Sequence, residues 1–216
     1  MKNYNPELPL ISLHIPKCSG TSLLRAFADG HKEQKFNLIR FYPDIGISLP
    51  ENYSDSKTII HGHFVRWKNA AVEDKVAKPE QFVTVVRDPI DALISGYWYG
   101  IQNGHDWAMK HSPESFLKWH IDANISPIFG ALQKLEDETN PENIVSKFLI
   151  IKTADQIDLF IEELSEMLKI SMPKIGKHNV SDKYSKKISK EIIDLSALIY
   201  KNEINLVRYL NGQTYY

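Results

Sequence analysis

The sequence predicts an α/β protein in which a central, mainly parallel sheet is flanked by helices in three layers. Short apolar runs rich in β-forming residues alternate with helical stretches, which is typical of βαβ units. Length and composition agree, because 216 residues with 43% apolar and 25% charged residues are typical of one soluble globular domain. A sheet of this kind binds ligands at the carboxyl ends of its strands.

Four apolar runs are the predicted strands: 10–15, 58–64, 81–86 and 147–151. Helices are expected at 21–30, from 89 to about 99, at 155–168, and as one or two helices within 185–210. In the helix at 155–168 the apolar residues recur at helical spacing. Residues 100–140 fit less well, and we expect a helical insertion within a single domain 1–216. The insertion is either a lid or acceptor wall, or ordinary helical packing.

Charge and cysteine content exclude several classes of function. The net charge is −1, so the overall field attracts neither nucleic acid nor a membrane, and any anion site must be local. Cys18 is the single cysteine and cannot form an intrachain disulfide. The chain has no signal-peptide pattern at its start and no apolar run of the roughly 20 residues needed to span a bilayer. We therefore expect a cytoplasmic protein without a nucleic-acid partner or a membrane span; the oligomeric state stays open.

The segment HIPKCSGTS (14–22) lies between the first predicted strand and helix. Its small residues allow several backbone N–H groups to point at one anion. Thr21 or Ser22 can cap the helix, whose N-terminus carries partial positive charge, and Lys17 adds a full charge. This predicts a phosphate-binding loop; the alternative is a plain turn with a capping hydroxyl and a solvated lysine.

Three common phosphate loops do not match this segment. The NTPase loop places its lysine after the glycine, whereas Lys17 precedes Gly20. The dinucleotide loop needs three spaced glycines, and this segment has one. A cysteine phosphatase loop needs Cys and Arg flanking five residues, but Cys18 and Arg25 flank six.

A second candidate anion site is the segment VRDPIDALISGY (86–97), which follows the third predicted strand. Arg87 lies where the strand ends, Pro89 suits the first turn of the next helix, and Ser95 falls about two turns along it. Arginine gives a forked, permanently charged grip on phosphate, and serine adds a hydroxyl donor. Taken alone, the segment is equally a strand-end ion pair followed by a helix start.

His61-Gly62-His63 ends the second predicted strand. Residues i and i+2 of a strand point to the same face, so we expect both imidazoles on one side. Histidine accepts protons near neutral pH, which makes the pair a candidate general base. The alternatives are core histidines or a metal pair; a metal site needs more ligands, and no acidic or cysteine cluster is spaced to supply them.

Together, the two anion motifs resemble those of the sulfotransferases that use 3′-phosphoadenosine 5′-phosphosulfate (PAPS). Residues 14–23 are similar to the 5′-phosphosulfate loop of the Golgi carbohydrate branch and its bacterial relatives, approximately H-x-P-K-x-G-G-T-S. Residues 87–97 are similar to the 3′-phosphate motif R-D-P-x-x-R-x-x-S-x-Y, and the two motifs stand in the family's order. Ser19 replaces the first loop glycine and is expected to need a less demanding backbone angle. Ala92 replaces the second arginine.

The resemblance implies a P-loop-like fold, PAPS as donor, adenosine 3′,5′-bisphosphate as product, and no metal. It implies that the 5′ end of the donor is held by Lys17, Cys18, Ser19, Gly20, Thr21 and Ser22. The 3′-phosphate would be held by Arg87 and Ser95. The reaction would be an in-line displacement in which Lys17 stabilises the leaving phosphate. The resemblance to glycan 2-O-sulfotransferases makes His63 the first candidate for the base and His61 the second.

A lysine-rich segment, 174–190, contains an Asn-x-Ser turn similar to the late loop that closes over the nucleotide in this family. The resemblance assigns Lys177, Asn179 and Ser181 to the cofactor; otherwise the lysines form a solvated helix face. We expect a small-molecule or glycan acceptor, the glycan by resemblance only; the sequence leaves a sugar, a lipid, a small alcohol and a peptide tyrosine open. Aromatic residues could stack on its rings or simply fill the core: Trp67, Tyr97, Trp98, Tyr99, Trp107 and Trp119.

Two other functions remain open at this point. A nucleotide-dependent kinase of related P-loop fold would need a lysine after the loop glycine and Mg²⁺ ligands, and neither is evident. A non-catalytic relative would keep the nucleotide site without using the histidines.

Overall fold

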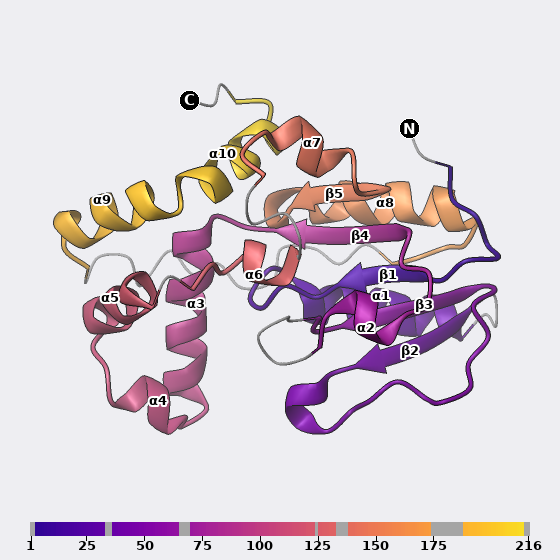
Figure 1. The fold of residues 1–216 in the computed structure, drawn as a ribbon, viewed down its shortest axis with the longest axis horizontal. Helices are drawn as coiled ribbons and strands as arrows, with labels where there is room; N and C mark the ends of the chain where they lie inside the picture. The colour runs from indigo at the N-terminus through magenta and orange to yellow at the C-terminus, as the bar shows by residue number, and fades with distance from the viewer. Residues whose placement is uncertain are drawn as a thin grey trace.

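The computed structural model describes residues 3–32, 36–64, 70–123, 125–132, 138–173 and 188–213. These residues contain one parallel sheet with the strand order β2-β3-β1-β4-β5 (Figure 1). The strands are β1 Leu10–Leu13, β2 Asn37–Phe41, β3 Thr58–Gly62, β4 Gln81–Val86 and β5 Ile150–Thr153. All four pairings are parallel, which confirms the predicted sheet type.

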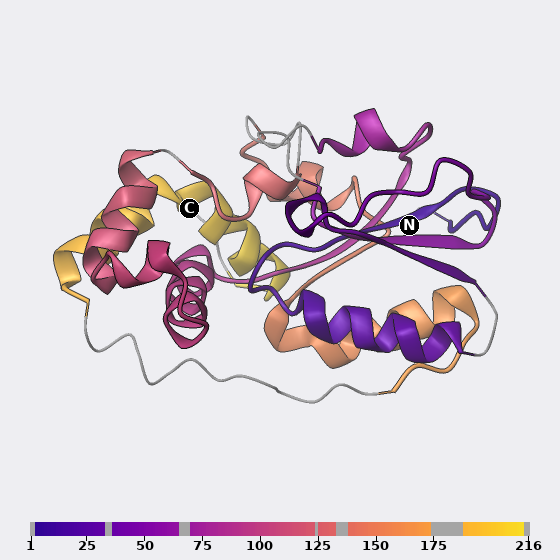
Figure 2. The ribbon, with the colours of Figure 1, turned by 90° about the horizontal axis from the view of Figure 1, so that it is seen from below.

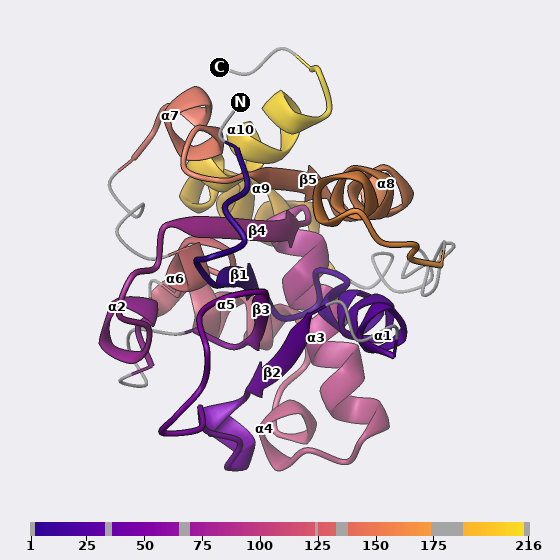
Figure 3. The same cartoon turned by 90° about the vertical axis from the view of Figure 1, so that its right-hand side faces the viewer.

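Helices follow most of the strands, as βαβ units require. They are α1 Gly20–His31, α2 Val72–Lys75, α3 Pro89–Gln102, α4 Asp106–Met109, α5 Pro113–Asp122, α6 Phe129–Leu132, α7 Pro141–Val145, α8 Ile157–Leu168, α9 Lys190–Ile199 and α10 Lys201–Leu210, with the short 3₁₀ turns η1 Pro43–Ile45 and η3 Ala154–Gln156. Helices α1 and α8 lie on one face of the sheet, and α2 and α6 lie on the other (Figure 3). The predicted three-layer α/β fold is therefore confirmed.

Strand β2 was not predicted. It lies at the edge of the sheet, and only Phe41 of its five residues is buried, so the segment carries no continuous apolar run. The last strand was predicted at 147–151, but β5 spans Ile150–Thr153. Phe148 is buried in the core without belonging to a strand, which explains why the sequence pattern starts too early.

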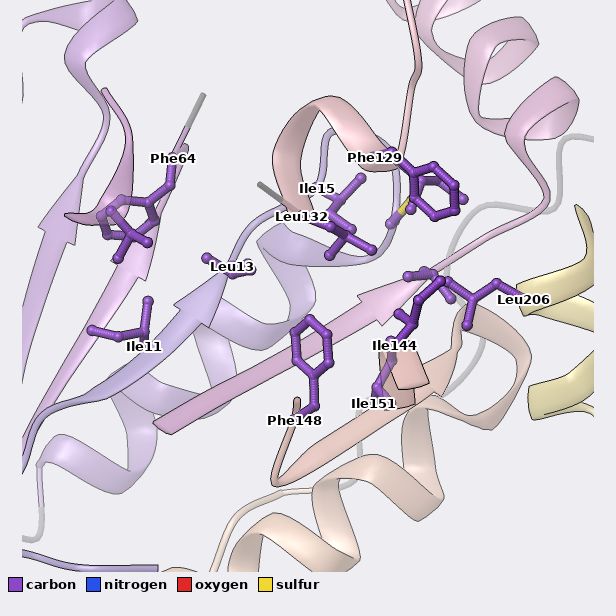
Figure 4. Close-up of a cluster of buried hydrophobic side chains, with 14 of the residues drawn as sticks. Ile11, Leu13, Ile15, Phe64, Phe129, Leu132, Ile144, Phe148, Ile151 and Leu206 are labelled. Carbon is purple, nitrogen blue, oxygen red and sulfur yellow. The ribbon is translucent and has the colours of Figure 1, made fainter. Parts of the chain in front are cut away.

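The two faces of the sheet bury different sets of side chains because neighbouring residues of a strand point in opposite directions. On β1, Leu10 packs with the cluster formed by α1 and α8, whereas Ile11 and Leu13 pack with the cluster on the other face. Figure 4 shows the second cluster, to which α6, α7 and α10 contribute Phe129, Leu132, Ile144 and Leu206. The sheet is thus buried on both faces, as a parallel sheet requires.

A third apolar cluster lies beyond the carboxyl ends of the strands, where α3, α4, α5 and α9 pack together (Figures 1 and 2). Its buried members include Leu93, Tyr97, Ala108, Phe116 and Leu117. The described helices between residues 100 and 123 therefore pack against α3 and α9 through buried side chains.

The register of β1 brings three chain segments to one edge of the sheet. Leu13 is level with Gly62 of β3 on one side and with Thr84 of β4 on the other. The pairing continues past β1, where the His14 amide donates to the Gly62 carbonyl at 2.8 Å. The residues that follow β1, β3 and β4 consequently meet at the carboxyl edge.

Gly62 permits the close approach of β2 and β3 at this edge. A Cβ atom at position 62 would lie 1.8 Å from the Phe41 carbonyl oxygen, a backbone atom that has no freedom to move aside. That same carbonyl accepts a hydrogen bond from the His63 amide at 2.8 Å. Gly62 therefore lets His63 reach its place beside the end of β2.

We expect Gly62→Ala to lower the free energy of unfolding by about 3 kcal/mol or more, because the methyl group forces β2 and β3 apart. Urea denaturation measures the change. Gly130→Ala is the matched control, since no atom lies within 4 Å of a Cβ atom placed there, and we expect it to change stability by less than about 1 kcal/mol. Equal effects of the two substitutions would contradict the steric argument.

Candidate functional site

The loop between β1 and α1 adopts a backbone shape suited to binding an anion. Lys17 and Ser19 both have left-handed backbone angles, with φ of 64° and 65°. The expectation that Ser19 would need a less demanding angle than a glycine was wrong: it has φ 65° and ψ 13°. Non-glycine residues rarely adopt this conformation, and such local strain is often found where a loop is shaped for function.

The start of α1 presents backbone donors that have no acceptor in the described part of the chain. Among the described residues, no group accepts from the amides of Ser19, Gly20 and Thr21, and Ser19 makes no side-chain cap. The next two amides, of Ser22 and Leu23, donate to the Ser19 carbonyl at 3.0 and 3.1 Å. Unused amides at a helix N-terminus carry positive partial charge and bind phosphate or sulfate groups.

Position 20 has to be a glycine because the His14 ring occupies the space that a side chain would need. A Cβ atom at position 20 would lie 1.7 Å from Cδ2 and 2.0 Å from Nε2 of His14. The imidazole of His14 thus packs directly against the first turn of α1. A glycine here lets the ring and the helix start come together.

Cys18 lies in the same loop but turns away from the anion-binding side. Its side chain is 1% exposed and packs in the core, and its amide donates to the Ile15 carbonyl at 3.1 Å. Burial raises the pKa of the thiol to about 12, so it stays protonated and unreactive. With its amide bonded to Ile15 and its thiol buried and protonated, Cys18 offers no free donor to an anion.

Two cations lie near the loop because β1 and β4 are neighbours. Lys17 follows β1 and Arg87 follows β4. Burial lowers the pKa of Lys17 from its ordinary value, and the nearby charge of Arg87 lowers it further. Two positive charges held this close repel each other, and an anion between them would relieve the repulsion.

Helix α3 begins directly after Arg87, as predicted. Asp88 caps it by accepting from the amides of Ile90 at 2.9 Å and Asp91 at 3.1 Å, and Pro89 occupies its first turn. Arg87 also lies 3.8 Å from the Asp91 carboxylate, one turn along the helix. The strand end and the helix start are present as predicted, and they place Arg87 at the carboxyl edge of the sheet. The ion pair with Asp91 belongs to the alternative, structural interpretation of this segment, so both interpretations of Arg87 stay open.

The side chain of Lys17 runs along α3. Its Cγ atom would lie 3.7 Å from a Cβ atom at Gly96, and its ammonium group lies 4.1 Å from the centre of the Tyr99 ring. Ser95 precedes Gly96 and lies partly exposed on α3. The first loop and the helix of the second motif are therefore in contact through Lys17.

The two candidate histidines of β3 have different surroundings. His61 is fully buried, and its Nδ1 lies 2.8 Å from the Ser12 hydroxyl of β1. Its Nε2 has no partner of good hydrogen-bond geometry among the described residues, although the Gly20 backbone lies near enough to raise its pKa slightly. Burial outweighs this effect and lowers the pKa of His61 to about 3, so the ring is neutral.

His63 follows the end of β3, and its side chain is 20% exposed. Its Nδ1 lies 3.1 and 3.3 Å from the two carboxylate oxygens of Asp44 in η1. The imidazole is also within ring contact of His14, with 4.5 Å between centroids. The expectation that both histidines of β3 lie on one side is met, because the rings of His61 and His63 both contact His14.

His14 joins these groups to the loop between β1 and α1. Its Nδ1 lies 3.1 Å from the Tyr42 hydroxyl, and its ring stacks on His61 at 5.2 Å. Burial lowers the pKa of His14 to about 2 and raises the pKa of Tyr42 to about 12. Tyr42 therefore keeps its proton and donates to a neutral His14.

Sequence reasoning did not give site roles to His14, Tyr42 and Asp44. His14 stood inside the loop motif, which was a usable signal, but Tyr42 and Asp44 follow the strand that the sequence did not reveal. Trp67, Lys177, Asn179 and Ser181 lie outside the described residues. Of the other aromatic residues, Tyr97 is buried and Trp98 partly buried, and about half of each remaining side chain is exposed: Tyr99, Trp107 and Trp119.

The described parts of the chain contain neither a metal-binding group of side chains nor a membrane-spanning helix. Within the described ranges, no three side chains of the metal-binding types His, Cys, Asp and Glu are grouped so that they could hold an ion. No described helix combines the length and the apolar character required to cross a bilayer.

Comparison with known proteins gave one family match. Residues 3–123, slightly more than half of the chain, match the family described as "Sulfotransferase family". The match includes the loop after β1, both histidines of β3 and the segment from Arg87 to Ser95. A search of curated proteins found no significant match.

The buried neutral histidines predict that stability falls in acid. His14 and His61 have folded-state pKa values of about 2 and about 3, below the ordinary 6.5. Between these values the unfolded chain binds more protons, so stability is greatest above about pH 6.5 and falls as the pH drops towards the folded-state pKa. We expect the free energy of unfolding to fall by about 2 kcal/mol per histidine between about pH 7 and about pH 5.

Urea denaturation at the two pH values tests this expectation. In the His14→Gln variant the free energy of unfolding should fall less over the same interval, by the contribution of one histidine, about 2 kcal/mol. Acidic groups such as Glu203 titrate in parent and variant alike, so the difference between them isolates His14. A parent protein equally stable at both pH values would rule out the neutral-histidine assignment.

Proposed function

The chain belongs to the sulfotransferase family, and we propose that it moves the sulfuryl group of PAPS onto an acceptor hydroxyl, with His63 as general base. The observation that carries the proposal is the loop after β1. The amides of Ser19, Gly20 and Thr21 at the start of α1 have no acceptor among the described residues, and the cations Lys17 and Arg87 lie beside them. His14 packs on that helix start and contacts His63, so a candidate base adjoins the anion-binding loop.

The described residues fit the two ends of a doubly phosphorylated nucleotide. The amides of Ser19 to Thr21 and the ammonium group of Lys17 suit the 5′-phosphosulfate, because they combine helix-terminal donors with a full charge. Arg87 and Ser95 suit the 3′-phosphate, since guanidinium gives a forked grip and serine one further donor. The contact of Lys17 with α3 supports one ligand bridging both groups.

In the proposed reaction the acceptor oxygen forms a bond to sulfur while the bond between sulfur and the 5′-phosphate oxygen breaks. The electron pair of the broken bond goes to the phosphate oxygen, where Lys17 and the loop amides stabilise the charge. The acceptor proton goes to His63. The chain's residues act by positioning and electrostatics, as in phosphoryl transfer, and the reaction needs no covalent enzyme intermediate.

The surroundings of the two histidines favour His63 over His61 as the base. His61 is fully buried, engages Ser12 and has a pKa lowered to about 3, so it is poorly placed to receive a proton from an acceptor. His63 is partly exposed, and its Nδ1 faces a carboxylate. We therefore propose that His63 is the base and that His61 supports His14 by stacking against its ring.

We expect His63→Ala to lower kcat by about 10²–10⁴-fold, the usual contribution of a general base, and to leave adenosine 3′,5′-bisphosphate affinity within about twofold. Radiolabelled PAPS offered with a library of hydroxyl acceptors, including glycans, measures turnover, and calorimetry measures affinity. His31→Ala is the control, because His31 ends α1 about 16 Å from the loop. Unchanged turnover in His63→Ala would argue against this base, and a parent inactive with every acceptor would favour a non-catalytic relative.

We expect Arg87→Ala to weaken adenosine 3′,5′-bisphosphate by about 10–100-fold and adenosine 5′-monophosphate far less, because only the first ligand has a 3′-phosphate. Calorimetry without Mg²⁺ gives both affinities, and Mg·ATP is the comparison ligand for a kinase. The Ser95→Ala variant should show a smaller loss in the same direction. Equal weakening of the two adenosine phosphates would remove Arg87 from the 3′ site, and a preference for Mg·ATP would favour the kinase.

A further inference from the structure

The contact between Asp44 and His63 is unusual among the described histidines. Both carboxylate oxygens of Asp44 lie near one imidazole nitrogen, at 3.1 and 3.3 Å from Nδ1 of His63. The side chains of His63 and Asp44 are 20% and 30% exposed, so the pair is partly shielded from water. The ring nitrogens of His14 and His61 have neutral oxygen partners instead, on Tyr42 and Ser12.

The backbone fixes both members of the pair. The His63 amide donates to the Phe41 carbonyl at 2.8 Å, which ties the end of β3 to the end of β2. The turn that carries Asp44 is closed by a pair of bonds between Tyr42 and Ile47, at 2.9 and 3.0 Å. Gly46 then turns the chain with φ 79°, a left-handed angle that glycine adopts without strain. Asp44 and His63 therefore approach each other from two anchored segments.

Two rings limit the motion of the His63 imidazole. The Tyr42 ring meets it edge to face, with 4.8 Å between centroids and 77° between planes. The His14 ring lies 4.5 Å from it at 58°. With the ring held by these neighbours and Nδ1 facing Asp44, Nε2 is the nitrogen with no hydrogen-bond partner among the described residues.

We propose that Asp44 is a positioning residue for His63, holding the Nδ1 proton so that Nε2 is the nitrogen that takes the proton from the acceptor. The inference rests on the proposed function, since it assigns a role to the same base. An ionised carboxylate accepts hydrogen bonds and cannot donate them, so Asp44 selects the His63 tautomer with the proton on Nδ1. It also stabilises the imidazolium that forms once Nε2 has taken the second proton.

Among the described residues, the other groups that face His63 do not supply an alternative to Asp44. They are Tyr42, which stays protonated, and His14, which is neutral and already accepts from Tyr42. His61 lies beyond His14 and is neutral too. Of these neighbours, Asp44 alone carries a negative charge that can pair with the protonated ring.

The test is Asp44→Asn, which keeps the size of the side chain and removes its charge. We expect kcat to fall at least about tenfold, while the KM for PAPS and the affinity for adenosine 3′,5′-bisphosphate stay within about twofold. Nitrogen-15 NMR of the imidazoles gives a readout that does not depend on turnover. The parent should show His63 with its proton on Nδ1, and Asp44→Asn should lose that preference.

A double-mutant cycle separates positioning from a merely structural effect. If Asp44 acts through His63, Asp44→Asn should have no further effect on kcat in the His63→Ala background. Asp29→Asn is the control, because Asp29 forms an exposed ion pair with Lys32 on α1, and we expect no change in tautomer or kcat.

An additive loss in the double variant, or an unchanged His63 tautomer in Asp44→Asn, would overturn the proposal. Two other results could occur together: the parent protein shows no sulfuryl transfer, and Asp44→Asn still loses the Nδ1 tautomer of His63. They would support the role of Asp44 in setting the tautomer and contradict the proposed reaction. The two hypotheses therefore fail by different measurements.

Discussion

The parallel pairing of β1 between β3 and β4 is the constraint on which the site depends. Parallel strands end at the same edge, so the residues that follow these three strands meet although up to about 70 positions separate them in sequence. Lys17, His63 and Arg87 reach this edge from β1, β3 and β4 respectively. A shift of one residue in either pairing would turn the following side chains to the opposite face.

Two glycines allow the segments that meet at this edge to come into direct contact. Gly20 lets the His14 ring pack on the start of α1, and Gly62 lets β3 approach the Phe41 carbonyl at the end of β2. His14 and His63 then touch, which joins the anion-binding loop to the candidate base. In both places a single methyl group would occupy space already filled by a ring or by backbone, so side-chain packing at the site depends on two positions without side chains.

The charges of the site arise locally in a chain whose net charge is −1. Positive potential on one side comes from Lys17, Arg87 and the amides of α1 that have no acceptor within the described residues, and Asp44 supplies a negative charge beside His63. Burial keeps His14 and His61 neutral, so they add volume and hydrogen bonds without adding charge. The groups proposed for anion binding and for proton acceptance are therefore different, and they come from different strands that end at one edge of the sheet.

The sequence by itself determined the sheet type, four of the five strands, the helix start at Pro89 and the family, because these features depend on local apolar runs and on the residue spacing of two short motifs. The sequence could not reveal β2, since an edge strand with one buried residue leaves no apolar run. The turn that carries Tyr42 and Asp44 follows β2, so it was not predicted either. Only the tertiary structure decided that Ser19 adopts a left-handed angle and that His61 is enclosed while His63 is partly exposed. Those outcomes depend on which strands are neighbours, and contacts between residues distant in sequence are not encoded in any single local pattern.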